Sequence, residues 1–202
     1  MDIIGNEFRT AVKRETGKSW AEWTALLDAD CAPDGGYDEA AAYLAEVHGL
    51  DDRWVTILAG TNEHRQGRKP VGLTAAVGYQ IGVRRTVRRP KLEVWDTLVS
   101  PSGLRLWLGE MSELQLQAGA RFVTKEGNVG TLRIVKPPDK LRMAWQMPGW
   151  DKPSTLQLQL LASGEARTTV SYHQEKLTDL YMRETMRRRW ETALDELQAL
   201  CD

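Results

Sequence analysis

The sequence predicts an α+β protein in which a curved antiparallel β-sheet surrounds one long C-terminal α-helix, preceded by a small all-α domain. Apolar residues recur at helical spacing up to about residue 60, alternate at a spacing of two from Gly78 onward, and return to helical spacing near the C-terminus. These changes predict a helical domain at 1–60, a linker at 61–77 and a sheet-and-helix domain at 78–202.

The N-terminal segment is expected to form short helices. Ser19 and Glu22 make a capping-box pattern, in which each side chain satisfies a free backbone N–H at the start of a helix. Similar apolar spacing predicts one helix before this point and two after it, around residues 4–12, 38–48 and 51–58. From Gly60 to about Val77 the composition shifts to Thr, Asn, Gln, Gly, Arg, Lys and Pro, which is typical of a linker.

The segment from Gly78 to Val87 alternates apolar and polar residues, which predicts a strand. Two short helices are expected between Pro90 and Leu108. Beyond them, alternating runs separated by turn residues predict about six antiparallel strands, beginning with the run at 114–116. Such alternation implies that one face of the sheet is buried and the other is solvated.

The last element has the most regular pattern. Its apolar residues are spaced by three and four, which predicts a helix from about Thr178 to Leu200: Met182, Met186, Trp190, Ala193, Leu194, Leu197 and Cys201. A sheet with one buried face needs a cover, and this helix is the only predicted element long enough to provide it.

The charge distribution argues against nucleic acid as a partner. Residues 1–77 hold 8 Lys and Arg against 13 Asp and Glu, a net charge of −5, and residues 78–202 hold 19 against 15, a net charge of +4. An acidic first segment would repel phosphates, and +4 spread over the second segment is modest. A helix-turn-helix around Leu44 and Trp54 is therefore a less favoured alternative, because its second helix would begin with Asp51 and Asp52.

The cysteines and the N-terminus indicate a cytoplasmic protein. Cys31 and Cys201 lack the spacing of a disulfide framework, so reduced thiols are expected. The first residues lack the basic and apolar regions of a signal peptide, and no run approaches the ~18 apolar residues of a membrane span.

The gap between the sheet and the terminal helix is the predicted binding site for an apolar small molecule, lipid-like or aromatic. Its predicted lining consists of aromatic, Met and Leu residues: Trp107, Met143, Trp145, Leu158, Tyr172, Met186 and Trp190. Aromatic and Met side chains form adaptable apolar pockets, and Trp145 or Tyr172 could each offer a hydrogen-bond donor. The alternative is that these side chains fill an ordinary core.

Catalysis is less favoured, and no catalytic residue is assigned. Inward strand positions are nearly all apolar, and Arg85, in phase with them, lies near a strand end where its charge can reach solvent. Tyr172 alone, with an ordinary pKa near ~10, is a poor acid–base catalyst at neutral pH. His48, His64 and His173 are widely separated, so neither a metal site nor a cofactor is expected.

Protein interaction without a ligand is an alternative role of a different class, in which the N-terminal helices or the outer face of the sheet would bind a partner. The basic run 187–189 is interpreted as the solvated side of the last helix, because glutamates lie four positions from two of its arginines.

The order of elements resembles the helix-grip superfamily, also called START-like or SRPBCC. The resemblance rests on the helix that begins Pro90-x-x-x-Val-Trp and on a terminal helix with Trp190 followed by Leu-x-x-Leu. Within this superfamily, the run from Arg85 to Leu98 resembles the branch of homologues of the heat-shock chaperone ATPase activator. The resemblance covers about residues 78–202 and implies a cavity for lipid-like or aromatic molecules, or a co-chaperone-like role.

The first segment resembles a small helical domain of unknown function found in bacterial proteins. The matching residues are Thr16-Gly17-Lys18-Ser19, Glu22-Trp23 and the later Leu44-x-x-x-His48-Gly49-Leu50. Such domains occur fused to helix-grip domains of this type, which supports the predicted division into two domains.

Overall fold

The computed structural model describes residues 3–32 and 35–201. The remaining residues, which include the outer limits of the two predicted domains and part of the loop after Cys31, lie outside the described part. The chain forms two compact units. The N-terminal unit comprises the chain up to Tyr79 together with Leu177–Thr185, and the C-terminal unit comprises Gln80–Lys176 and the chain from Met186.

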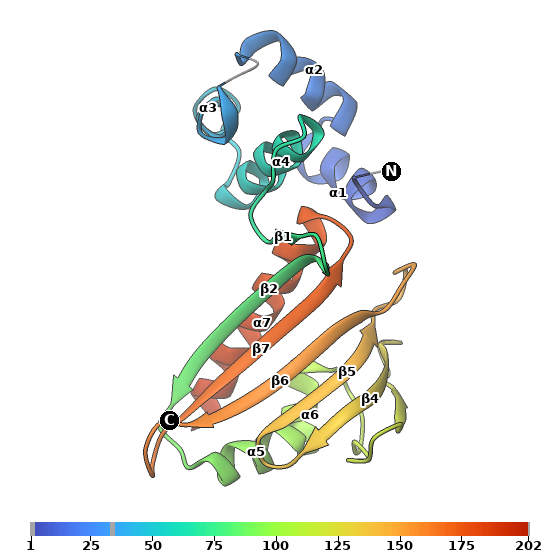
Figure 1. The fold of residues 1–202 in the computed structure, drawn as a ribbon, viewed down its shortest axis with the longest axis vertical. Helices are drawn as coiled ribbons and strands as arrows, with labels where there is room; N and C mark the ends of the chain where they lie inside the picture. The colour runs from blue at the N-terminus through green and yellow to red at the C-terminus, as the bar shows by residue number, and fades with distance from the viewer. Residues whose placement is uncertain (1–2, 33–34, 202) are drawn as a thin grey trace. The chain divides into compact units, whose positions relative to one another are not determined.

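The N-terminal unit is helical, as the apolar spacing predicted. Its helices are α1 (Asn6–Thr16), α2 (Trp20–Asp30), α3 (Gly36–Ala42), the π-helical continuation η1 (Tyr43–Val47) and α4 (Asp52–Arg65) (Figure 1). The capping box is present, because the Ser19 amide donates to Glu22 Oε2 at 2.7 Å and Ser19 Oγ accepts from the Glu22 amide at 3.3 Å. Asp51 caps α4 by accepting from the Trp54 amide at 2.8 Å.

The segment 61–77 contains regular structure. Helix α4 continues to Arg65, and the Thr61 hydroxyl donates to the Ile57 carbonyl at 2.6 Å within the helix. Strand β1 (Leu73–Thr74) then pairs antiparallel with the start of β2 (Gly78–Val87). The polar composition concealed this helical end because buried Thr and Asn can satisfy their side chains inside a helix. Whether the two units fold as independent domains stays a prediction.

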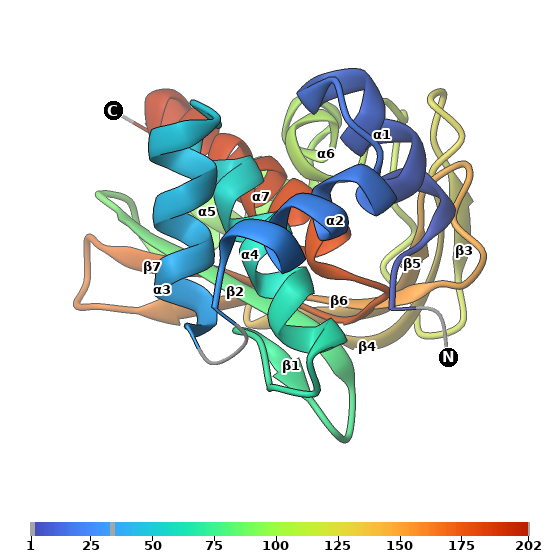
Figure 2. The same ribbon diagram turned by 90° about the horizontal axis from the view of Figure 1, so that it is seen from above.

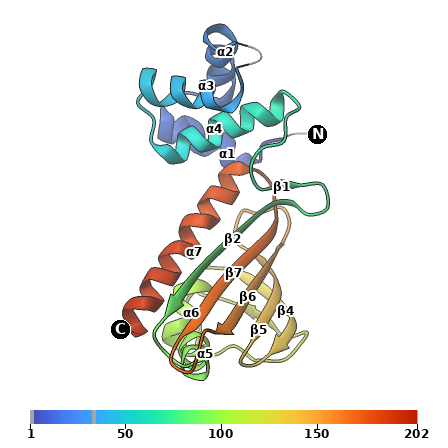
Figure 3. The same cartoon turned by 60° about the vertical axis from the view of Figure 1, so that its left-hand side comes forward.

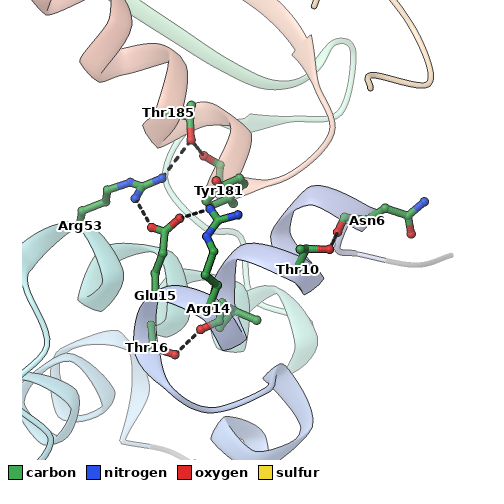
Figure 4. A network of polar contacts seen from close by, with 9 residues as sticks. Asn6, Thr10, Arg14, Glu15, Thr16, Arg53, Tyr181 and Thr185 are labelled. Atoms are coloured by element: carbon green, nitrogen blue, oxygen red, sulfur yellow. Dashed lines mark hydrogen bonds and ion pairs between the residues drawn. The ribbon is translucent and has the colours of Figure 1, made fainter. Parts of the chain in front are cut away.

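A polar and aromatic network lies inside the N-terminal unit (Figure 4). The Trp54 and Tyr181 rings stack with centroids 5.8 Å apart, and the Arg53 guanidinium lies 5.3 Å from the first centroid and 5.1 Å from the second. Arg53 Nη1 is 2.9 Å from Glu15 Oε2, and Arg53 Nη2 donates to the Thr185 hydroxyl at 3.1 Å. Arg53 is therefore both stacked and paired with a carboxylate.

Asp179 connects two distant segments of the chain within the same unit. One carboxylate oxygen accepts from the Gly5 amide at 2.7 Å, and the other accepts from the Met182 amide at 2.8 Å. The second bond caps helix α7 (Leu180–Cys201). Asp179 as a whole exposes 3% of its surface, so both bonds are largely shielded from water.

The C-terminal unit holds most of a sheet with the strand order β1-β2-β7-β6-β5-β4-β3, in which the paired strands run antiparallel (Figures 1 and 3). The curved antiparallel sheet and the long C-terminal helix were both predicted, and both are confirmed. The further strands are β3 (Arg121–Val123), β4 (Val129–Lys136), β5 (Lys140–Gln146), β6 (Ser154–Ala162) and β7 (Thr168–Leu177).

The predicted strand at 114–116 is wrong. The backbone bonds to β4 begin at Gly119, whose amide donates to the Leu132 carbonyl at 2.8 Å, and continue at Ala120, whose carbonyl accepts from the Leu132 amide at 2.9 Å. Leu114 is buried in an irregular segment, while Leu116 is half-exposed. Two apolar residues spaced by two therefore arose here without a strand, which leaves five strands after the short helices.

One face of this sheet is covered by helices. The two short helices α5 (Lys91–Val99) and α6 (Pro101–Trp107) lie on the same side of the sheet as α7 (Figure 2). The buried residues of α7 within the C-terminal unit keep the predicted spacing: Met186, Trp190, Ala193, Leu194, Leu197 and Cys201. In the described part of the chain, none of the helices is long and apolar enough to span a membrane.

Candidate ligand site

Four aromatic residues of the predicted site form a continuous series of ring contacts inside the C-terminal unit. Trp107 and Tyr172 have ring centroids 5.8 Å apart, Tyr172 stacks on Trp190 at 5.0 Å, and Trp190 lies 5.6 Å from Trp145. These four rings, called here the aromatic cluster, come from α6, β7, α7 and β5. Four elements distant in sequence therefore meet at one place.

The three aliphatic residues of the prediction also face the inside. Leu158 on β6 is opposite Tyr172 on β7, Met143 on β5 is opposite Leu156, and Met186 lies one helical turn before Trp190. None of the seven predicted residues exposes more than 1% of its surface. They are core residues in this structure, and their contact with a ligand stays a prediction.

A buried chain of hydrogen bonds fixes one side of the aromatic cluster. Trp190 Nε1 donates to Gln174 Oε1 at 2.8 Å, Gln174 Nε2 donates to Ser154 Oγ at 2.8 Å, and Ser154 Oγ donates to the Trp145 carbonyl at 2.8 Å. Each side chain in this series of hydrogen bonds therefore has a defined orientation. Gln174 is in phase with the buried positions of β7, although a polar side chain was not predicted at this site.

Two other donors of the aromatic cluster have no acceptor. The indole N–H of Trp145 and the hydroxyl of Tyr172 are shielded from solvent and make no hydrogen bond to any described residue. Burial raises the pKa of Tyr172, so its hydroxyl remains protonated and can only donate or accept as a neutral group. Leaving a buried donor unpaired costs about 1–3 kcal/mol, so these atoms are expected to have a role.

Arg189 of α7 covers the aromatic cluster. Its guanidinium carbon lies 5.4 Å from the centroid of Trp145 and 5.6 Å from that of Trp190, and Nη2 donates to the Trp107 carbonyl at 3.2 Å. Arg189 Nε is buried and has no acceptor among the described residues. Burial lowers the pKa of Arg189, which the charge of Glu126 opposes, and the group remains a cation at neutral pH.

A pocket of about 640 Å³ opens beside Arg189. That volume lies within the roughly 300–1,000 Å³ usual for small-molecule sites. Its lining comes from α6, α7 and the loops around β4 and β5: Arg105, Leu106, Gly109, Glu126, Asn128, Met147, Pro148, Arg189, Thr192 and Glu196. None of the seven predicted residues is part of this lining, and Arg189 connects it to the aromatic cluster.

The pocket wall is fixed by backbone contacts. The Asn128 side-chain amide donates to the Leu108 carbonyl at 2.8 Å, and the Glu110 amide donates to both oxygens of the Glu126 carboxylate at 3.0 Å. Gly109 has a φ of +130°, and a Cβ there would lie 2.4 Å from Glu126 Oε2. Only glycine at this position leaves the Glu126 carboxylate where it is.

A protein family described as "Activator of Hsp90 ATPase homolog 1-like protein" matches residues 88–202. This match covers more than half of the chain. The chain belongs to this family. No curated protein sequence matches it.

Solved structures agree with the fold of this Hsp90-activator-like family. An HSP90 activator from Plasmodium falciparum is similar with a TM-score of 0.52 and 17% identity, over 60% of this chain and 94% of that chain. CalU16 from Micromonospora echinospora is similar with a TM-score of 0.53 and 24% identity, over 63% of this chain and 78% of that chain. Protein MLL2253 from Mesorhizobium loti is similar with a TM-score of 0.50 and 20% identity, over 60% of this chain and 95% of that chain. At these identities the likeness shows the fold alone.

Arg189 is the residue that the sequence analysis misplaced. Arg187 does pair with the glutamate one turn later, and Arg188 is exposed, as expected of a solvated face. Arg189, however, is three residues after Met186 and four before Ala193, which are both buried. It therefore sits at the edge of the buried stripe, from which its long side chain reaches the aromatic cluster. These spacings in the sequence could have indicated that Arg189 is less exposed than Arg188.

The other charged candidates are used within the fold of this Hsp90-activator-like chain. Arg85 reaches α7, where its Nη2 lies 2.6 Å from Asp195 Oδ1 and its Nη1 donates to Gln198 at 3.4 Å. Across residues 3–32 and 35–201, no three His, Cys, Asp or Glu side chains gather as a metal site.

Proposed function

We propose that the C-terminal unit binds an apolar small molecule, which enters at the pocket beside Arg189 and contacts the aromatic cluster. One observation carries this proposal. Arg189 belongs both to the pocket wall and to the surface of the aromatic cluster, where it covers Trp145 and Trp190. A molecule in the pocket is therefore separated from the rings by a single flexible side chain.

The composition of the core favours a flat or elongated apolar ligand. Aromatic rings offer large faces for stacking, and Met143 and Met186 have flexible side chains that can repack around an added molecule. Because the side chains fill the core in this structure, binding requires these methionines and Arg189 to change rotamer. Family membership supports the proposal, since the helix-grip superfamily includes lipid-transfer domains and aromatic cyclases.

Fluorescence titration with apolar aromatic and fatty-acid probes tests this proposal. Saturable binding that shifts tryptophan emission is expected. Thr192→Trp should weaken it, because Thr192 is exposed on α7 and lines the pocket, so a large ring there blocks entry without disturbing the core. The matched control is Ala199→Trp, at an exposed position of the same helix outside the lining.

Two outcomes of the titration would contradict the proposal. If no probe binds the native chain, the proposed function is wrong. If Thr192→Trp and Ala199→Trp bind equally well, the entrance is not at this pocket.

Docking of a protein partner is a second candidate, favoured by a different surface. Val123 on edge strand β3 and Val129 on β4 are register partners, and they expose 67% and 40% of their surfaces. They line a groove of about 390 Å³ together with Arg121 and Arg133. The family description and the Plasmodium structure both name Hsp90, so a chaperone of this type is the partner to test.

The ATPase rate of an Hsp90-type chaperone, with and without this chain, is the measurement for the second candidate. The chain should raise the rate, and Val123→Lys should remove the effect because it places a charge in the apolar part of the groove. Leu161→Lys, at another exposed apolar position on β6, is the control. An unchanged ATPase rate with the native chain would remove this candidate.

A further inference from the structure

We infer that the ligand carries an uncharged hydrogen-bond acceptor, a carbonyl oxygen on a flat apolar frame, that accepts from Arg189, Trp145 and Tyr172. The inference rests on the proposed function and deepens it, because it names the chemical class of the ligand and the residues that select it.

Three buried donors without an acceptor lie on or over the rings of the aromatic cluster. Arg189 Nε, Trp145 Nε1 and the Tyr172 hydroxyl are buried and lack an acceptor among the described residues. The Arg189 guanidinium covers both Trp145 and Trp190, and Tyr172 stacks on Trp190 at 5.0 Å. Arg189 therefore covers the ring that carries one of the other two donors and the ring on which the second is stacked, and Arg189 itself lines the pocket.

Arginine and the tryptophan indole have donors and no acceptor, so neither can satisfy the other. The one group able to accept, the Tyr172 hydroxyl, has no hydrogen bond. A ligand atom with lone pairs would satisfy several of these donors at once, whereas an amine or an ammonium would not.

The charges of the pocket exclude a net negative charge on the ligand. The pocket lining contains two arginines, Arg105 and Arg189, and two glutamates, Glu126 and Glu196, so its charges balance. The Thr124 hydroxyl and backbone N–H groups hold the pKa of Glu126 below its ordinary range, so Glu126 is a carboxylate at neutral pH. An anion would lose its hydration and meet this charge, whereas a carbonyl oxygen would not.

Tyr172 and Trp190 are stacked with 25° between their planes, whereas Trp107 and Trp145 are tilted by 37° and 58° to the rings they contact. A planar molecule can extend such a stack. An aromatic ketone or a quinone combines that shape with a carbonyl oxygen at one edge.

The experiment uses three probes that share one frame: 9-fluorenone, fluorene and fluorene-9-carboxylate. Equilibrium dialysis with the full chain gives the dissociation constant of each. A hydrogen bond to a charged donor predicts that fluorenone binds about tenfold more tightly than fluorene. The carboxylate should bind no more tightly than fluorene.

Two variants assign this preference to named residues. Arg189→Met should lower the affinity for fluorenone more than the affinity for fluorene, so that the ratio of the two falls toward one, because Met keeps an apolar side chain over the rings but has no donor. Tyr172→Phe should remove part of the preference. Arg188→Met, on the exposed side of the same helix, is the control and should change neither affinity. Near-UV circular dichroism confirms that each variant keeps its packed core.

Every result of the dialysis bears on the inference. Equal binding of fluorenone and fluorene by the native chain, or an equal loss of both in Arg189→Met, overturns the inference and leaves the proposed function in place. Tightest binding of the carboxylate also overturns it, and would identify an anion as the ligand. If none of the three probes binds, the inference fails, and the titration with fatty-acid probes decides the proposed function separately.

Discussion

Arg53 in the N-terminal unit and Arg189 in the C-terminal unit have nearly the same surroundings. Each is half-buried, each covers two aromatic rings at 5.1–5.6 Å, and each has a buried Nε without an acceptor among the described residues. They differ in their partners. Arg53 lies 2.9 Å from the Glu15 carboxylate (Figure 4), whereas Arg189 contacts one backbone carbonyl, that of Trp107.

The difference separates a structural arginine from one available to a ligand. A partly buried cation loses hydration, and a carboxylate within the fold restores much of that loss. Arg53 has this partner and can stabilise its unit. In the described part of the chain, Arg189 has no carboxylate at ion-pair distance and faces a pocket instead. Its full interaction therefore requires a molecule from outside the chain.

The loss of Trp190, one of the two rings that Arg189 covers, should have the largest effect on the free energy of unfolding. Trp190→Ala removes a fully buried ring, its stacking on Tyr172 and its bond to Gln174, and should cost about 3–5 kcal/mol of unfolding free energy. A urea melt measures the loss. Leu200→Ala, on the exposed end of α7, should change little. A loss below about 1 kcal/mol for Trp190→Ala would place Trp190 outside the core.

The two arginines themselves give the direct comparison. Arg53→Met leaves Glu15 without one of its partners and should cost about 1–2 kcal/mol, between the values for exposed and buried ion pairs. Arg189→Met removes a charge that has no carboxylate and should cost less than about 0.5 kcal/mol. Paired urea melts of both variants make the measurement. Equal losses would show that Arg189 is structural too.

Two aromatic donors give a second comparison between the units: the Tyr172 hydroxyl has no acceptor among the described residues, whereas Trp23 Nε1 has one. Tyr172→Phe removes a buried donor that has no partner, so stability should stay unchanged or rise by up to about 1 kcal/mol. The counterpart is Thr16→Val, which deletes the acceptor of Trp23 Nε1 at 2.8 Å and should cost about 1 kcal/mol. Thermal melts compare the two, and a loss in Tyr172→Phe would indicate a bound water or another acceptor at the hydroxyl.

The smallest expected effect is a difference in acid sensitivity. Burial alone would raise the pKa of Glu15, but hydrogen bonds from Arg14 and Arg53 hold it below its ordinary value. The stability from this pair is therefore complete above the unfolded pKa of about 4.3 and is lost as pH falls through the lower folded pKa. Melts from about pH 5 to pH 3 should show the cost of Arg53→Met shrinking. The cost of Arg189→Met should change less.

Much of the fold could be predicted because its signals are local. Alternation at a spacing of two marked β2 from Gly78 to Val87, and spacing of three and four marked α7. Ser19 and Glu22 were recognisable as a capping pair because a cap involves only neighbours in sequence. The inward phase of the strands likewise indicated four of the seven candidate residues, Met143, Trp145, Leu158 and Tyr172, and the spacing of α7 indicated Met186 and Trp190.

The polar part of the candidate site could not be predicted in the same way. The spacing of Arg189 from Met186 and Ala193 puts it at the edge of the buried stripe, but its contacts with Trp145 and Trp107 depend on where α7 meets the sheet. Gln174 acquires its role only when Trp190 and Ser154 arrive from other elements. Whether Trp145 and Tyr172 find acceptors is likewise a property of the assembled core, because those acceptors would lie on strands and helices distant in sequence.

The hydrogen bond from Gly5 to Asp179 affects the order in which the chain can mature on the ribosome. The segment Leu177–Thr185 supplies both this acceptor and the Tyr181 ring that stacks on Trp54. At about 5–20 residues per second, the roughly 100 residues between Tyr79 and this segment take about 5–20 s to synthesise. During that interval helices α1–α4 have left the ribosome with Phe8 and Trp54 still lacking their last neighbour. The unit whose synthesis begins first therefore completes its core only after most of the other unit has been made.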